Sequence, residues 1–398
     1  MNNTFQNYNL PSALLGALAR MQYDTPTAIQ DQVIPVALTG QDILGSSKTG
    51  SGKTAAFSIP VVAQLMNEPG AKVLVLAPTR ELAEQVEGVM STMASGCKHL
   101  RTALLIGGEP IGKQLMRLRS HPNVIVGTPG RVEDHLYRGS LHINDTSFLI
   151  LDEIDRMLDM GFSIQIDKII KRLPVERQTL MFSATLDRSI EKLARAYLKD
   201  PARINIEIDD NEEKNIKEEC LYVSESDKFD ILVKQLNERE GSIIVFVKTQ
   251  IKADDVCYQL QEANYNAQVI HGGLKQYHRK RVIEDFRNQR YSIIVATDVA
   301  ARGLDIDHIK HVINYDFPQT AEDYTHRIGR TGRAGATGFA FSMIASSQEK
   351  RLWSIIHNEP VERETRRPLR REGEARPNRL RSSYPFTPRK DYSNYNEN

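Results

Sequence analysis

Two segments of the chain carry residues suited to phosphate chemistry. The first is a typical phosphate-binding loop made of Ser47, Lys48, Thr49, Gly50, Ser51, Gly52, Lys53 and Thr54. Its glycines let backbone N–H groups curve around phosphates, while Lys53 can reach the β- and γ-phosphates and Thr54 can hold Mg²⁺. The second segment is Asp152-Glu153, which follows an apolar run. Asp152 is suited to contact the metal and Glu153 to orient or deprotonate a water. Together they predict binding and hydrolysis of a nucleoside triphosphate with magnesium.

An arginine-rich turn supplies candidate partners for the γ-phosphate. It reads His326-Arg327-Ile328-Gly329-Arg330-Thr331-Gly332-Arg333, and we expect Arg330 and Arg333 to act as arginine fingers. A guanidinium at the γ-phosphate stabilises the charge of the transition state and raises rates by about 10³–10⁵ in other enzymes. The alternative is a surface cluster that pairs with carboxylates. If the arginines act as fingers, hydrolysis requires the part of the chain that carries them to close over the loop.

Apolar strands alternate with amphipathic helices twice along the chain. In residues 40–205 the expected strands are 43–45, 73–77, 102–106, 124–127, 148–152 and 180–183, with helices such as 80–93 and 186–198 between them. The pattern restarts with strands at 243–247, 268–270, 293–296, 312–315 and 339–344, and helices at 229–237, 252–262 and 276–287. Such alternation predicts parallel sheets that are covered on both faces.

These patterns predict an α/β protein with two sheet domains. We expect an N-terminal domain over 1–205, a flexible acidic linker over 206–216, a second domain over 217–357 and a disordered, arginine-rich tail over 358–398. The length of 398 residues is sufficient for two cores. A net charge of +1 means that any basic surface is local. The lone Trp353 is expected in the core or in domain packing.

Other features limit the location and the redox chemistry of the chain. The three cysteines show no metal or disulfide spacing. The N-terminal residues lack the pattern of a signal peptide, and the sequence has no apolar run long enough to span a membrane. We therefore expect a cytoplasmic protein without a membrane partner.

Several loops that follow predicted strands suit the backbone of a nucleic acid. Pro78-Thr79-Arg80, Gly107-Gly108 and Thr128-Pro129-Gly130-Arg131 offer amides, hydroxyls and guanidiniums at one sheet edge. Each alone is an ordinary turn or helix cap, but the three together favour a groove for a strand. Thr297 is suited to donate to a phosphate. The hydroxyls of Ser183 and Thr185 can hydrogen-bond Asp155, or they can cap a helix.

Taken in order, these motifs closely resemble the DEAD-box family of ATP-dependent RNA helicases over about residues 5–357. The resemblance implies two RecA-like domains that close on ATP and single-stranded RNA and separate short duplexes locally. It implies adenine recognition by Gln30 and stacking by Phe5, with Tyr23 in the same motif and further ATP contacts from Gly303 and Asp305. It implies RNA contacts from Pro78, Thr79, Arg80, Gly108, Thr128, Gly130, Arg131, Gln276, Arg279 and Thr297. It also implies that the two domains are coupled by Asp155, Ser183, Thr185 and His326.

The sequence departs from the family pattern at two positions. The name-giving tetrad reads Asp152-Glu153-Ile154-Asp155, with isoleucine where alanine is usual, and Ser47 also replaces an alanine. The carboxylates remain, so metal binding and hydrolysis should survive. The larger Ile154 must find room near residues 183–185, which puts the coupling of hydrolysis to unwinding in question.

The favoured function is an RNA-stimulated ATPase that unwinds short duplexes or remodels RNA–protein complexes. The alternative is an ATP-gated RNA clamp or chaperone with weak unwinding, and a DNA helicase is a third hypothesis. The cofactors are ATP and Mg²⁺, and the partners are RNA and, as candidates, RNA-processing or ribosome-assembly proteins. The tail, with arginines among tyrosines and a phenylalanine, suits loose RNA binding or has no special role.

Overall fold

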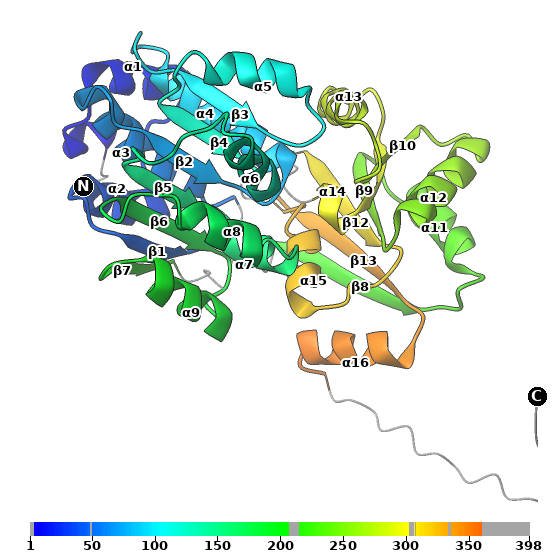
Figure 1. The fold of residues 1–398 in the computed structure, drawn as a ribbon. Helices are drawn as coiled ribbons and strands as arrows, with labels where there is room; N and C mark the ends of the chain where they lie inside the picture. Colours follow the sequence, from blue (N-terminus) through cyan, green and yellow to red (C-terminus); the bar gives the residue numbers. More distant parts are fainter. Residues whose placement is uncertain are drawn as a thin grey trace, which may run out of the picture.

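In the computed structural model the chain forms two α/β units that lie side by side, the first coloured blue to green and the second yellow-green to orange (Figure 1). The structure describes residues 4–47, 50–206, 215–301, 306, 308–332 and 336–359. Most of the predicted linker and tail therefore lies outside the described residues. So do the predicted site residues Lys48, Thr49, Gly303, Asp305 and Arg333.

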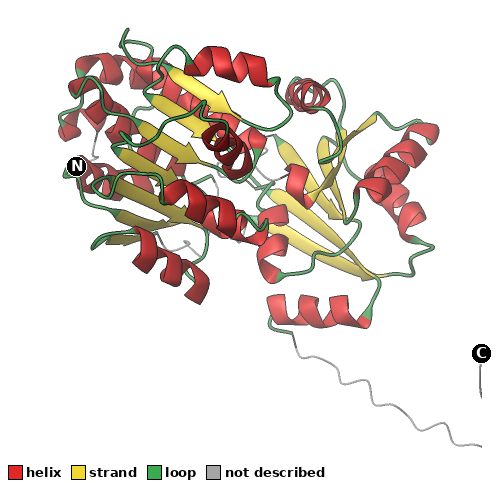
Figure 2. Cartoon of the chain, viewed as in Figure 1, coloured by secondary structure: helices red, strands yellow, loops and turns green. Residues whose placement is uncertain are grey.

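The first unit is built on a parallel sheet of seven strands in the order β3-β4-β2-β5-β6-β1-β7. The strands are β1 (Ile43–Ser46), β2 (Val73–Leu76), β3 (Thr102–Leu105), β4 (Val124–Gly127), β5 (Phe148–Leu151), β6 (Gln178–Ser183) and β7 (Ala202–Asn205). The helices are η1 (Phe5–Tyr8), α1 (Ser12–Arg20), α2 (Ala28–Leu38), α3 (Lys53–Asn67), α4 (Arg80–Ala94), α5 (Ile111–Leu118), α6 (Pro129–Tyr137), α7 (Ile154–Asp159), α8 (Ser163–Ile170) and α9 (Arg188–Tyr197). Helices cover both faces of the sheet (Figure 2).

The second unit repeats this architecture with a parallel sheet of six strands in the order β10-β11-β9-β12-β13-β8. The strands are β8 (Ile216–Tyr222), β9 (Ser242–Val247), β10 (Ala267–Ile270), β11 (Ile293–Thr297), β12 (Ile309–Asn314) and β13 (Gly338–Ile344). The helices are α11 (Lys228–Asn237), α12 (Gln250–Glu262), α13 (Gln276–Arg287), α14 (Asp298–Ala301), α15 (Ala321–Ile328) and α16 (Ser347–Ile356).

Each sheet separates two hydrophobic clusters, which explains the continuous apolar runs in the sequence. In β2, Val73 and Val75 join the cluster on one face, while Leu74 and Leu76 join the cluster on the other. Successive side chains of a strand point to opposite faces, so a strand buried on both faces must be apolar throughout. The predicted α/β class with two parallel sheets is confirmed.

Two edge strands were not predicted from the sequence. Most residues of β7 and β8 are partly or fully exposed, and both strands contain charged side chains such as Arg203, Lys217 and Glu219. An edge strand has one neighbour and one open side, and charges there discourage pairing with other chains. The apolar signal used to predict strands is therefore weak at both positions.

The expectation for Trp353 is confirmed. Its side chain is buried in a cluster with Phe317 and Tyr324, and its ring stacks on His357 at 3.7 Å. Among the described residues, no helix is long and apolar enough to cross a membrane.

Candidate functional site

The phosphate loop connects β1 to α3 and depends on glycine at two positions. Gly50 and Gly52 have φ values of +84° and +93°, which favour glycine strongly. Helix α3 begins at Lys53, so its free N–H groups point into the loop. The buried ammonium of Lys53 donates to the carbonyl oxygen of Ser47 at 2.6 Å, and the hydroxyls of Ser47 and Ser51 are 2.9 Å apart. The loop is therefore organised around the lysine that would meet the phosphates.

The start of α2 is attached to this loop by Thr27 and Gln30. The Gln30 side chain accepts from the backbone N–H of Thr27 at 3.0 Å and donates to the carbonyl of Gly52 at 3.2 Å. The Thr27 hydroxyl donates to the carbonyl of Ser51 at 2.9 Å. A Cβ atom on Gly52 would lie 2.5 Å from the Gln30 amide nitrogen, so this contact also requires glycine. A ligand that contacts the Gln30 side chain would therefore also affect the conformation of the phosphate loop, because the same side chain is bonded to Gly52.

Phe5, the predicted stacking partner of the base, and Tyr23, predicted to contact ATP, belong to the same region. Phe5 lies in η1 and is buried in the core of the first unit, with Tyr23 packed against the same cluster. The role of Phe5 in stacking stays a prediction.

The acidic pair follows β5, and Asp152 is strongly buried there. Its side chain is 2% exposed, and its Oδ1 atom has no hydrogen-bond partner among the described residues. Burial, and then the adjacent Glu153 carboxylate, raises the pKa of Asp152, while Lys53 opposes the rise. Glu153 has a left-handed backbone with φ of +51° and precedes α7. Buried negative charge beside a phosphate loop favours a bound cation.

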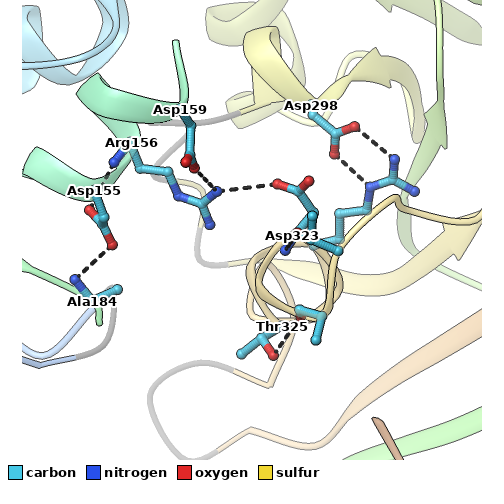
Figure 3. A network of polar contacts seen from close by, with 10 residues as sticks. Asp155, Arg156, Asp159, Ala184, Asp298, Asp323 and Thr325 are labelled. Atoms are coloured by element: carbon cyan, nitrogen blue, oxygen red, sulfur yellow. Dashed lines mark hydrogen bonds and ion pairs between the residues drawn. The ribbon is translucent and has the colours of Figure 1, made fainter. Parts of the chain in front are cut away.

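The acidic turn is joined to the end of β6 through Asp155 (Figure 3). Its Oδ2 atom accepts from the backbone N–H of Ala184, and its Oδ1 atom accepts from that of Arg156, both at 3.0 Å. The sequence pointed to the hydroxyls of Ser183 and Thr185 as donors, but the donor is the amide between them. The Ser183 hydroxyl instead accepts from the Thr185 N–H at 3.3 Å. A main-chain donor fixes the geometry without depending on a side-chain rotamer.

Most of the predicted RNA-contacting residues of the first unit line one cavity of about 550 Å³. Its lining contains Pro78, Thr79, Arg80, Gly107, Thr128, Gly130 and Arg131, together with Gly272 and Arg279 of the second unit. Met160 and Phe162, which were not singled out from the sequence, line it as well. The Thr79 hydroxyl caps α4 by accepting from Leu82 N–H at 3.2 Å, so the cap interpretation holds beside the groove interpretation.

Helices α4 and α13 bring the two units together beside this cavity. Arg279 pairs with Glu81 at 2.8 Å, and both side chains are buried. Arg80 donates to the Gln276 side-chain oxygen at 3.3 Å. A Cβ atom on Gly108 would lie 2.5 Å from Arg80 Nη1, so glycine leaves room for this approach. Glu81 directly follows the predicted segment 78–80, but the sequence assigned it no role, because an acid in the first helical turn is common for reasons of the helix dipole alone.

The arginine-rich turn follows α15 and is held by a buried arginine that the sequence did not single out. Arg327 donates to both oxygens of Asp298 at 2.6 and 2.7 Å and to the backbone oxygen of Asp316 at 2.6 Å. His326 and Arg330 line a water-sized cavity of about 10 Å³ beside Asp298. Thr297 is buried at the end of β11. Arg327 thus anchors α15 on the second sheet.

Comparisons with known proteins cover both units. The DEAD/DEAH box helicase family matches residues 27–193, and the helicase conserved C-terminal domain matches residues 227–335. The chain is 41% identical over 357 residues to the DEAD-box ATP-dependent RNA helicase CshA of Bacillus subtilis, which covers 89% of this chain and 72% of that protein.

Two solved structures share the fold and the arrangement of the units. Dbp5 of S. cerevisiae bound to RNA and ADP BeF3 has a TM-score of 0.81 and 30% identity, over 89% of this chain and 93% of that one. Mss116p bound to ssRNA and AMP-PNP has a TM-score of 0.81 and 27% identity, over 91% of this chain and 79% of that one. The chain belongs to the DEAD-box family of ATP-dependent RNA helicases.

Proposed function

We propose that this ATP-dependent RNA helicase unwinds short duplexes, or remodels RNA–protein complexes, when two domains close over ATP and an RNA strand. The domains would span residues 1–205 and 217–357, joined by 206–216. The observation that carries the proposal is the joint contribution of both units to one groove, where Arg279 of the second unit lies beside Arg80, Thr128 and Gly130 of the first. A groove that needs both units links strand binding to closure.

The nucleotide site would be divided between the two domains. Lys53 and the amides of residues 47–54 would hold the phosphates, with Gln30 as the proposed adenine contact. Glu153 would orient the attacking water, and Arg330 and Arg333 would stabilise charge at the γ-phosphate after closure. Asp305 and Gly303 would complete the nucleotide contacts. Hydrolysis would then depend on RNA because RNA favours the closed arrangement.

The residues present fit a magnesium ion. The buried, unpartnered Oδ1 atom of Asp152 and the hydroxyl of Thr54 are oxygen donors of the kind that this ion prefers. When bound, the metal would neutralise the charge that develops on the phosphates. Asp152 would hold it, partly through water, and Asp155 would keep the acidic turn in place through Ala184.

The strand would be bound through its backbone. Pro78, Thr79, Arg80, Gly108, Thr128, Gly130, Arg131, Gln276, Arg279 and Thr297 are the proposed contacts, and they offer amides, hydroxyls and guanidiniums without an evident base reader. Protein partners in RNA processing or ribosome assembly, like a cytoplasmic location, stay predictions.

Ile154 bears on the choice between helicase and clamp. Its side chain is fully buried in the hydrophobic cluster formed by α6, α7 and α8 on one face of the first sheet. The isoleucine is therefore accommodated within the core, and its size does not by itself favour the clamp alternative.

Steady-state ATP hydrolysis with and without single-stranded RNA tests the proposal, together with displacement of a short duplex strand. We expect RNA to stimulate ATP hydrolysis. Glu153→Gln should lower the stimulated rate by about 10²-fold or more, while binding of RNA in the presence of ATP persists. RNA binding without strand release would favour the clamp. Equal stimulation by single-stranded DNA would revive the DNA helicase hypothesis.

A further inference from the structure

An ion pair joins the two units on the side of the acidic turn, away from the α4–α13 contact. Arg156 Nη1 of α7 lies 3.2 Å from Asp323 Oδ1 of α15 (Figure 3). The same nitrogen lies 3.4 Å from Asp159 Oδ2 in its own helix. The Arg156 side chain is 3% exposed, that of Asp323 19% and that of Asp159 58%. Arg156 therefore keeps the solvated Asp159 as a partner in any arrangement of the units. It gains the less exposed Asp323 as a second partner only when the units meet.

Arg156 is fixed relative to the catalytic carboxylates. Its backbone N–H donates to Asp155 Oδ1, while Asp155 Oδ2 accepts from Ala184, so the turn that carries Asp152 and Glu153 is held from both sides. With the backbone fixed and the side chain buried, the guanidinium projects from the first unit at a defined place.

Asp323 is equally well fixed in the second unit. The Thr320 hydroxyl accepts from its backbone N–H at 3.1 Å and caps α15. One turn further on, Arg327 is anchored to Asp298 through both carboxylate oxygens. The same helix carries His326, and Arg330 follows directly after it. A shift of Asp323 against Arg156 would therefore shift His326 and Arg330 as well.

A partly buried ion pair of this kind selects geometry more than it adds affinity. Removing Asp323 leaves the buried guanidinium of Arg156 with the solvated Asp159 as its partner, a weaker arrangement than the pair across the contact, although a well-packed apolar pair can be as stable as the intact one. Charge pairs across an interface also fix register and reject wrong alignments. The pair thus favours the one closed arrangement in which both charges are satisfied.

We propose, on the basis of the function proposed above, that Arg156 and Asp323 are a positioning pair that sets α15 against the acidic turn on closure. The pair acts through His326 and Arg330, which it brings to a defined place beside Asp152 and Glu153. The α4–α13 contacts would bring the domains together around RNA. The Arg156–Asp323 pair would align the two parts of the ATP site, one from each domain, for hydrolysis.

A double-mutant cycle tests the pairing. Arg156→Gln, Asp323→Asn and the double variant are compared for RNA-stimulated kcat and KM, and for affinity toward a fluorescent ADP analogue without RNA. We expect each single change to lower kcat/KM for RNA about ten-fold, a size within the range of measured couplings between contacting residues. The double variant should lose no more than the worse single variant, because the pair is already broken. Affinity for the ADP analogue should stay within about two-fold, since the open first domain binds it without the second.

A conservative variant and an exposed pair separate positioning from folding. Arg156→Lys keeps the charge without the planar fork and should recover part of the loss. Arg203 and Glu191 form an exposed pair at 2.6 Å within the first unit, and the matched variants Arg203→Gln and Glu191→Gln should leave RNA stimulation unchanged. Thermal unfolding without nucleotide checks that each variant is folded, and Arg156→Lys replaces Arg156→Gln in the cycle if the latter is not.

Two results would overturn the pairing. If the single variants are as active as the unmodified chain, the ion pair has no role in hydrolysis. If the losses in kcat/KM multiply in the double variant, the two residues act independently. Both outcomes require an unmodified chain that RNA stimulates. If RNA fails to stimulate that chain, the proposed function itself is wrong, so the two failures are distinguishable.

Discussion

Replacing Asp152 by asparagine should stabilise the ligand-free protein while destroying its activity. Burial, followed by the Glu153 charge, raises the pKa of Asp152 from an ordinary value of 3.8 to about 7. Each pKa unit corresponds to about 1.36 kcal/mol, so the ionised side chain destabilises the folded state by up to about 4 kcal/mol above pH 7. Asparagine removes the charge but remains a buried polar group, so we expect it to recover about half, or about 2 kcal/mol.

The sign of the pH dependence follows from proton binding. Between about pH 4 and pH 7 the unfolded chain has an ionised Asp152, whereas the folded chain binds a proton there. The contribution of Asp152 to stability therefore improves as pH falls through this window. The advantage of Asp152→Asn should be fully present above pH 7 and should fade toward about pH 4.

Thermal unfolding of the first domain, without nucleotide or metal, measures this effect. A gain of about 2 kcal/mol corresponds to an increase in Tm of roughly 4–8 °C for a domain of this size. ATP with magnesium should then stabilise the unmodified chain but not the variant, because only the former retains the carboxylate.

Asp187 provides a matched control with the opposite sign. It caps α9 through backbone N–H groups of Ser189 and Ile190, and these bonds lower its pKa. Asp187→Ala should therefore lower stability by about 1 kcal/mol. The reasoning about Asp152 is refuted if Asp152→Asn lowers the Tm above pH 7, or if its gain is the same at about pH 5 and about pH 8.

Three further changes have defined outcomes. Ile154→Ala empties a buried position and should lower the free energy of unfolding by about 2–4 kcal/mol in denaturant titrations, with hydrolysis per folded molecule unchanged; more unwinding per ATP would instead support the clamp alternative. Gln30→Ala removes the bond to the Gly52 carbonyl and should raise the KM for ATP about ten-fold, measured at saturating RNA; an unchanged KM would exclude Gln30 from nucleotide binding. Arg330→Lys should lower RNA-stimulated kcat by about 10³ without changing nucleotide affinity in the absence of RNA; a loss of affinity alone would argue against an arginine finger.

Features whose physical causes are local in the chain could be predicted from its sequence. Gly50, Gly52 and Lys53 stand within one loop, so their spacing alone predicts the turn and the phosphate chemistry. The central strands are buried on both faces, so their composition alone predicts two parallel sheets. In both cases the physical requirement acts on neighbouring residues, which is why a linear pattern reveals it.

The contacts between the two halves could not be predicted in this way and are visible only in the folded structure. The Arg279–Glu81 and Arg156–Asp323 pairs join residues far apart in the sequence, and the donor to Asp155 is a main-chain amide that any residue could supply. Strands β7 and β8 are partly exposed at sheet edges, so their sequences lack an apolar pattern. These features depend on the relative orientation of folded units, and no local preference of the chain encodes that orientation.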